Sequence, residues 1–174
     1  TAADLAAMLP TLAGYKGAVT VSDTITLAEL KAINNATTGA ITLVTQSGAL
    51  SGSAADILAA FKGIKSYEGA VEVTGTDYKL ADLKAINAIT EGAFTVDSPI
   101  ALTGTAKDLA AALDGVTAYA GKVTVTGSYI VDDLKDINTA VDGDVVLANK
   151  KVALTGKIAD ITAALTGITD YTGA

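Results

Sequence analysis

Hydrophobic and polar residues alternate along six short stretches of the chain. In one of them Val19 and Val21 flank Thr20, and in another Val71 and Val73 flank Glu72. A period of two places successive side chains on opposite faces of a β-strand, so that one face can be buried. The alternation predicts strands at residues 19–21, 41–43, 71–73, 94–96, 123–125 and 145–147.

Before each alternating stretch, the apolar residues are three or four positions apart. Leu5 and Leu9, and likewise Leu30 and Ile33, have the spacing that one face of a short helix requires. Pro10 is expected to end or kink the first helix, because proline lacks the N–H group and clashes with the preceding turn. A Ser or Thr stands three residues before a first-turn Asp in three places, which predicts N-caps at Thr1, Ser53 and Thr105.

A second, shorter apolar piece follows each alternating stretch. We predict that each piece forms a further short strand leading into the next helix, at residues 25–27, 49–50, 78–80, 100–102, 129–131 and 152–154. One unit is then a helix, a strand and a short strand in about 26 residues.

The whole chain repeats with a period of 52 residues. Four series of residues keep this interval: Asp4, Asp56, Asp108 and Asp160; Leu5, Ile57, Leu109 and Ile161; Tyr15, Tyr67, Tyr119 and Tyr171; Gly17, Gly69, Gly121 and Gly173. Each block has two related halves, and the second half carries the motif Leu-Lys-x-Ile-Asn at residues 30–34, 83–87 and 134–138. The double repeats are residues 1–52, 53–104 and 105–156, with a partial one at 157–174.

The repeat predicts the fold class. A unit of about 26 residues has too few apolar side chains to fold alone, but stacked units bury their faces against neighbours, as in solenoids. We therefore predict an α/β solenoid over residues 1–174, with parallel β-sheets. The competing fold is a doubly wound α/β domain, whose strand–helix units are usually longer and keep no strict register. Since neither end resembles a polar cap, we expect a piece of a longer array.

The composition excludes several classes of function. The 174 residues include twelve lysines but no arginine, histidine, cysteine or tryptophan, and nineteen acidic residues give a net charge of −7. Without histidine and cysteine, the chain cannot form a Ser–His–Asp or Cys–His site or an ordinary zinc site. A negative chain without arginine is a poor nucleic-acid binder. Every apolar run is far shorter than the roughly 20 residues of a membrane span, so we predict no nucleic-acid partner and no membrane span.

The motif Thr-x-x-Asp-Leu, followed by Gly-x-Val-Thr-Val-x-Asp/Gly, occurs at Thr1–Leu5 and Gly17–Asp23. It resembles the repeats of very large secreted bacterial surface proteins, which are adhesin-like or surface-layer-like. Such proteins, often called hemolysin-type and exported by type I secretion, occur in cyanobacteria and other marine bacteria. The resemblance covers the whole chain and implies an extracellular, cell-surface location and a scaffold or adhesive role. The Gly-Gly-x-Gly-x-Asp calcium repeat of such proteins is absent, so their calcium sites are not transferred.

Two polar series are candidate site residues. The asparagines Asn34, Asn87 and Asn138 either line a ligand groove or satisfy backbone groups where the helix turns into the strand, and we favour the second role. The tyrosines of the 52-residue series could form a stacking platform for sugars. We instead expect each ring to cover a helix–strand corner with its hydroxyl in water.

The charged residues suggest three further roles. The aspartates of the 52-residue series are expected to be first-turn helix charges rather than a cation-binding ladder. The lysines of the second-half motif, Lys31, Lys84 and Lys135, are expected on solvent faces with their stems on apolar surface. Calcium takes six to eight oxygen ligands, and no such cage is fixed by the densest acidic cluster, Asp132, Asp133, Asp136, Asp142 and Asp144. We therefore predict no metal site and no cofactor.

The expected function is structural, as a rigid spacer, adhesin or surface-layer-like stalk. The alternative is a binding module that presents a repeated solenoid face to glycan, ice or cation surfaces through many weak contacts. That face is formed by the outward strand positions Thr20, Thr42, Glu72, Thr95, Thr124 and Val146. No repeat departs from the others to build a cleft with paired carboxylates, so we predict no enzymatic activity and assign no catalytic residue. The expected partners are neighbouring repeats or further copies of the chain, because exposed terminal strands pair readily, with a surface glycan as the candidate ligand.

Overall fold

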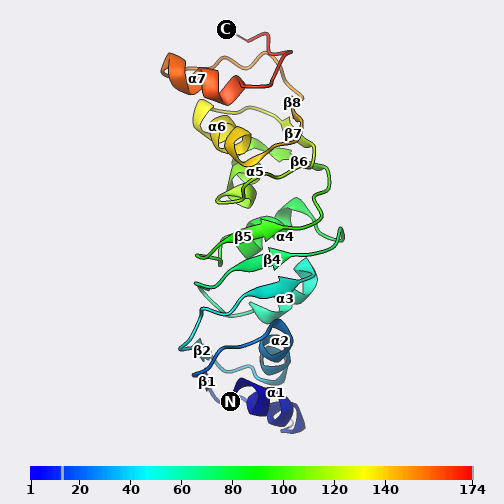
Figure 1. The fold of residues 1–174 in the computed structure, drawn as a ribbon, viewed down its shortest axis with the longest axis vertical. Helices are drawn as coiled ribbons and strands as arrows, with labels where there is room; N and C mark the ends of the chain where they lie inside the picture. The colour runs from blue at the N-terminus through cyan, green and yellow to red at the C-terminus, as the bar shows by residue number, and fades with distance from the viewer. Residues whose placement is uncertain (13, 174) are drawn as a thin grey trace. The chain divides into compact units, whose positions relative to one another are not determined.

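The computed structural model describes residues 1–12 and 14–173 of the chain. Over these residues, seven α-helices and one short 3₁₀ helix are interspersed with eight strands (Figure 1). The strands form three small parallel sheets, ordered β1–β2, β3–β4–β5 and β6–β7–β8. The chain is therefore an α/β protein with parallel sheets, as the sequence predicts at this level.

Two compact units make up the chain. The first unit comprises Thr1–Tyr78 and Ala88–Asp97. Its elements are α1 (Ala2–Met8), the 3₁₀ helix η1 (Leu9–Thr11), β1 (Val19–Val21), α2 (Leu27–Ala36), β2 (Ile41–Leu43), β3 (Leu50–Gly52), α3 (Ala54–Ala60), β4 (Val71–Val73) and β5 (Phe94–Val96).

The second unit comprises Lys79–Asn87 and Ser98–Ala174. Its elements are α4 (Leu80–Asn87), β6 (Leu102–Thr105), α5 (Ala106–Leu113), β7 (Val123–Thr126), α6 (Val131–Ala140), β8 (Val145–Leu147) and α7 (Ile158–Leu165).

The helix starts follow from side-chain caps. The hydroxyl oxygens of Thr1, Ser53 and Thr105 each accept a hydrogen bond of 3.2 Å from the backbone N–H three residues later, on Asp4, Asp56 and Asp108. This confirms the predicted N-caps and places these three aspartates in the first turn of α1, α3 and α5. Such caps are favourable because the first N–H groups of a helix have no partner within it.

Pro10 also behaves as the sequence predicts. Helix α1 ends at Met8, and Pro10 lies in the first positions of η1. Proline can occupy the first positions of a helix but not its interior, because it has no N–H group to donate to the preceding turn. The backbone therefore tightens into a single 3₁₀ turn and leaves the helix.

All six strands predicted from alternation are present. They correspond to β1, β2, β4, β5, β7 and β8. Within β1, Val19 and Val21 are buried and Thr20 is exposed, and β4 has Val71 and Val73 buried. Paired residues are 21 to 23 positions apart, as in Val19 with Ile41. Parallel pairing needs a crossover of this kind, and a helix supplies it between β1 and β2.

The short strands before the helices are only partly present. Among the described residues, only β3 and β6 belong to this class, and they start one to two residues later than predicted. The predicted strands at 25–27, 78–80, 129–131 and 152–154 are wrong. Four to six residues separate β1 from α2, β4 from α4 and β7 from α6, which leaves no room for another strand, whereas ten separate β2 from α3. Ten residues also separate β8 from α7, but no described strand pairs with residues 152–154. Residue 27 already belongs to α2, because Thr26 and Glu29 form a capping box at its start.

The core is built from the apolar stripe of the helices and the inward positions of the strands. In the first unit Leu30, Ile33 and Ile57 are completely buried, and in the second unit so are Leu83 and Leu109. Helix α2 packs on α3, α4 on α5, and α6 on α7. The helices are short, so their stability comes mainly from this packing rather than from propensity.

Candidate functional site

The lysines of the Leu-Lys-x-Ile-Asn motif form ion pairs with aspartates of the following helix. Lys31 on α2 pairs with Asp56 on α3, and Lys84 on α4 pairs with Asp108 on α5. Lys135 on α6 pairs with Asp160 on α7, with an N···O distance of 2.8 Å. The side chains are between one third and one half exposed. Each aspartate lies near the start of its helix, so the pair fixes the second helix beside the first at its N-terminal end.

The ion pairs change the proton affinity of their members. The hydrogen bond from Lys31, followed by that from Ser53 and by the charge of Lys31, lowers the pKa of Asp56 below its ordinary value of 3.8. The hydrogen bond from Lys84 lowers the pKa of Asp108 in the same way. On the other side of the third pair, the hydrogen bond to Asp160 raises the pKa of Lys135. Asp56 and Asp108 are therefore ionised at neutral pH and cannot act as acids there.

The asparagines of the same motif bind the other end of the following helix. The Nδ2 group of Asn34 donates hydrogen bonds to the carbonyl oxygens of Ala60 at 2.7 Å and Lys62 at 2.6 Å. Asn87 and Asn138 make the same pair of bonds at the ends of α5 and α7, at 2.8 to 3.1 Å. The last carbonyls of a helix have no partner within it. The prediction that the amide satisfies backbone groups is thus confirmed, but those groups belong to the next helix.

The tyrosines of the 52-residue series differ from the prediction. The rings of Tyr67 and Tyr119 are buried, and their hydroxyls donate to carbonyl oxygens 19 residues earlier, at 2.5 and 2.6 Å. Tyr171 makes the equivalent bond, at 2.7 Å. The expectation of hydroxyls in water is wrong for these three residues. The buried rings of Tyr67 and Tyr119 also have no face on which a sugar could stack.

Each of these rings explains a glycine two residues later. A Cβ atom at Gly69 would lie 2.6 Å from ring atom Cε1 of Tyr67, and one at Gly121 would lie 2.6 Å from Cε1 of Tyr119. Any side chain there would collide with the ring and with a neighbouring backbone carbonyl. The Tyr-x-Gly series of the sequence is therefore a packing motif.

Sequence reasoning missed the pairing of the lysine and aspartate series. The sequence pattern predicts solvated lysines and aspartates that act only on their own helices, whereas the structure pairs the two series. Their separations of 25, 24 and 25 residues are nearly constant. That constancy, for groups of opposite charge on consecutive helices, was the available signal.

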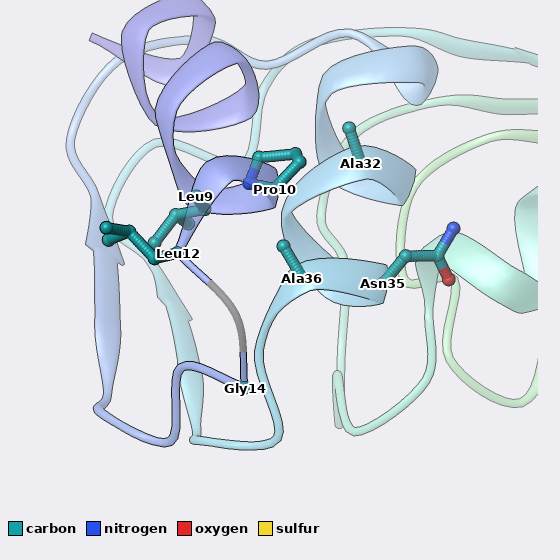
Figure 2. Close-up of a pocket in the computed structure, with 7 residues that line it drawn as sticks. All are labelled: Leu9, Pro10, Leu12, Gly14, Ala32, Asn35 and Ala36. Carbon is teal, nitrogen blue, oxygen red and sulfur yellow. The ribbon is translucent and has the colours of Figure 1, made fainter.

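A pocket of about 350 Å³ lies between η1, with the residues that follow it, and the C-terminal half of α2 (Figure 2). Its described lining residues are Leu9, Pro10, Leu12, Gly14, Ala32, Asn35 and Ala36. Figure 2 shows Pro10 beside α2 on the side of Ala32. Among these residues only Asn35 has a polar side chain and none is ionisable, so they supply no acid, base or nucleophile.

An equivalent pocket of about 220 Å³ lies between α5 and α6 in the second unit. Its lining includes Asp114, Asp136 and Thr139. Two repeats, or 104 residues, separate these three residues from Pro10, Ala32 and Asn35, which hold the equivalent positions in the first pocket. Since the polar groups differ, the two pockets do not form a repeated site for one ligand. Asp136 is the member of the predicted acidic cluster that lines this pocket.

Among the described residues, neither the acidic side chains nor the buried polar groups give a candidate metal site. Over residues 1–12 and 14–173, no group of three or more acidic side chains has a geometry that could hold a metal ion. Within the same residues, every buried side-chain nitrogen or oxygen has a hydrogen-bond partner. No buried polar side chain there is left pointing at an absent ligand.

The outward strand positions align across each sheet. Thr20 pairs in register with Thr42. Ser51, Glu72 and Thr95 form a second row, and Thr103, Thr124 and Val146 form a third. Neighbouring strands are about 4.8 Å apart, so each row places small polar side chains at that spacing, interrupted by Glu72 and Val146.

Comparison of the chain with protein-family models, curated proteins and solved structures finds no match. No helix of the described residues has the length and apolar character needed to cross a membrane. The contacts described above therefore carry the functional argument.

Proposed function

We propose that the chain is a segment of an α/β solenoid that serves as a rigid spacer in a large extracellular bacterial surface protein. The observation that carries the proposal is the clamp between consecutive helices. A Lys–Asp ion pair holds the start of the second helix, and an Asn amide holds its end. The same clamp joins α2 to α3, α4 to α5 and α6 to α7.

The clamp gives the solenoid a mechanical role. Two contacts at opposite ends of a helix resist both sliding and rotation against its neighbour, because each fixes one end in place. The strands pair in parallel, and paired residues are always 21 to 23 positions apart in the sequence, which supports the same stacking. In a solenoid each unit contacts only its neighbours, so that length is set by the number of units.

The surface location rests on the resemblance of the repeat to those of secreted bacterial surface proteins. The net charge of −7 and the absence of cysteine are compatible with this location. Antibodies against the chain should label intact cells of the source organism. Labelling only after permeabilisation would reject the extracellular location.

A deletion tests the spacer function. Residues 53–104 are removed and Gly52 is joined to Thr105, which restores the repeat register because Ser53 and Thr105 are equivalent. Small-angle scattering should show an elongated full chain and a variant shorter by about 14–20 Å, since 52 residues contain two helices and three strands. The cross-sectional radius should not change. A compact particle for the full chain would reject the solenoid. A deletion variant that loses its fold and is not shorter than the full chain would reject it as well.

A second candidate function is a binding module that uses the exposed strand face. The aligned rows, such as Thr20 beside Thr42, favour it. Glycan-array binding or thermal hysteresis in ice growth would support this function, provided that Thr20→Val and Thr42→Val reduce the signal. Without such a signal the spacer function alone stands.

A further inference from the structure

Among the described residues, the first layer of the chain lacks four partners that later layers have. We propose that α1 and β1 form a docking face for a segment like residues 27–52, which means a Leu-Lys-x-Ile-Asn helix followed by two strands. This inference rests on the proposed solenoid and identifies the chemistry of the neighbour on this side. The segment of residues 27–52 is hereafter called the second-type segment.

The first missing partner is a lysine for Asp4. The equivalent aspartates Asp56, Asp108 and Asp160 each receive a lysine from the preceding helix. Among the described residues, Asp4 is bound only by the amino group and hydroxyl of Thr1, at 3.1 and 2.7 Å. Its side chain is 79% exposed, compared with 45% for Asp56. The carboxylate is therefore accessible to an incoming ammonium group.

The second missing partner is a carbonyl for Tyr15. Tyr67 donates to Gly48 of the segment before it. Within residues 1–12 and 14–173, the Tyr15 hydroxyl makes no equivalent bond, and the residue is partly exposed. Buried tyrosine hydroxyls usually have an acceptor, and the second-type segment would provide one at its Gly48 position.

The third missing partner is a strand beside β1. Strand β4 lies between β3 and β5, whereas among the strands of the described residues β1 pairs with β2 alone. The backbone N–H of Thr74 donates to the carbonyl of Gly52 on β3 at 2.8 Å. Ser22 stands 52 residues before Thr74 and is exposed. An added strand like β3 would give this edge the pairing that β4 has.

The fourth missing partner is a set of apolar side chains that would bury the hydrophobic residues of α1 and η1. Leu5 on α1 is partly exposed, although the equivalent Ile57 on α3 is completely buried. Met8 and Leu12 are 55% and 46% exposed. In the layer of α3 and β4, the second-type segment supplies the lysine, the carbonyl, the strand and helix packing together. One occupant of this kind therefore accounts for all four gaps.

A second copy of the chain would present α7, which lacks the lysine and asparagine of the motif. Helix α7, the last helix, has the sequence Ile-Ala-Asp-Ile-Thr-Ala-Ala-Leu and contains neither lysine nor asparagine. Stacked on α1, it would bring Asp160 and Asp4 onto neighbouring helices without a cation between them. The geometry thus favours a second-type segment over the end of another copy.

The test adds the proposed occupant to the full chain. A copy of residues 27–52 is fused ahead of Thr1, so that its last glycine precedes Thr1 as Gly52 precedes Ser53. We expect Tm to rise by at least about 2–4 °C and hydrogen exchange of the Ser22 amide to slow at least about tenfold. The matched control carries Lys31→Met and Asn34→Ala within the added copy only, and should lose most of the rise in Tm.

A charge swap gives a second measurement. Asp4→Lys in the fused protein should lower Tm, and Lys31→Asp in the added copy should restore part of the loss. If the fused protein does not fold, a synthetic peptide of residues 27–52 is titrated into the unmodified chain, and slowed exchange at Ser22 is again expected. Unchanged Ser22 exchange in the folded fusion or with the peptide, or an equal rise in Tm from the control, would overturn the proposal.

Two outcomes separate this inference from the proposed function. An elongated full chain that shortens on deletion of 53–104, but whose Ser22 amide stays unprotected in the fusion, rejects the docking face and leaves the spacer. Concentration-dependent protection of Ser22 in the unmodified chain, together with dimers in light scattering, assigns the face to a second copy and also overturns the proposal.

Discussion

The hydroxyl of Tyr67 donates a hydrogen bond of 2.5 Å to the carbonyl oxygen of Gly48, 19 residues earlier in the chain. The ring is completely buried and lies 5.5 Å from that of Phe61, centre to centre. Burial raises the pKa of the Tyr67 hydroxyl, so the group remains a donor at all physiological pH values. One residue thus links the turn before β3 to the turn before β4.

Removing the Tyr67 hydroxyl should destabilise the chain. Tyr67→Phe keeps the ring but leaves the Gly48 carbonyl without this donor, at a cost of about 1 kcal/mol. We expect Tm to fall by about 2–4 °C in thermal unfolding followed by circular dichroism. The control Tyr15→Phe should leave Tm unchanged, since no such bond is made by Tyr15 among the described residues. Equal shifts in both variants would contradict this role of the bond.

A methyl group at Gly69 should be strongly unfavourable. Its Cβ would collide with the Tyr67 ring and with backbone carbonyls, which cannot move as a flexible side chain can. Gly69→Ala should cost about 1–3 kcal/mol in urea unfolding. At Gly156 the nearest atoms to a Cβ are those of Val131 at 3.6 Å and beyond. Gly156→Ala should therefore be nearly neutral, and a similar loss there would remove the steric explanation.

Truncation of Asn34 should weaken the attachment of α3 to α2. Asn34→Ala removes two hydrogen bonds to carbonyls at the end of α3, and we expect a loss of about 1–3 kcal/mol. The neighbouring Asn35 is exposed and provides the matched control Asn35→Ala. Chemical denaturation of both variants should show a loss only for Asn34. An unchanged denaturation midpoint for Asn34→Ala would refute the clamp.

Acid should loosen the contacts between helices. The folded-state pKa of Asp56 and Asp108 is below the ordinary value of 3.8 because lysines donate to them. A depressed carboxylate pKa stabilises the folded state above the ordinary pKa, and this contribution is lost as the pH falls through the folded value. The urea midpoint should therefore drop as the pH is lowered from about 4 towards 2.

Replacing a lysine tests the origin of this pH dependence. Lys31→Met keeps an aliphatic stem but removes the charge, so the fall in midpoint below about pH 4 should be smaller than in the unmodified chain. Lys16 is exposed and makes no ion pair among the described residues. Lys16→Met should keep the full fall. An identical pH profile for Lys31→Met would assign the effect to other carboxylates.

The sequence predicts the local elements well because their signals are local. The alternation of Val19, Thr20 and Val21 determines a strand with one buried face, and Thr1 three residues before Asp4 determines a cap. The short strands are harder to predict, since residues 25–27 and 49–50 look alike as apolar pieces. Whether such a piece forms a strand depends on two things: the number of residues before the next helix and the presence of a partner strand.

The contacts between helices are less accessible to sequence reasoning. A lysine on an amphipathic helix is usually solvated, and its partner Asp56 is 25 residues from Lys31. The burial of Tyr67 likewise depends on the layer before it. The residues of that layer are too distant in the sequence to belong to a local pattern around Tyr67. Such features depend on contacts between consecutive helices and strands, and the sequence signals that anticipate them are the 52-residue interval and the nearly constant separation of the lysines and aspartates.

Two kinds of neighbouring helices occur within the units, and this has a consequence for how such a gene can change in length. The Lys–Asn clamp joins α2 to α3, whereas among the described residues no such clamp joins α1 to α2, and a pocket lies between η1 and α2. Duplicating a single helix–strand unit would place two helices of one kind together and leave a lysine or an aspartate unmatched. Recombination that preserves folding therefore adds or removes units in pairs, and natural variants of the gene should differ by multiples of about 52 codons.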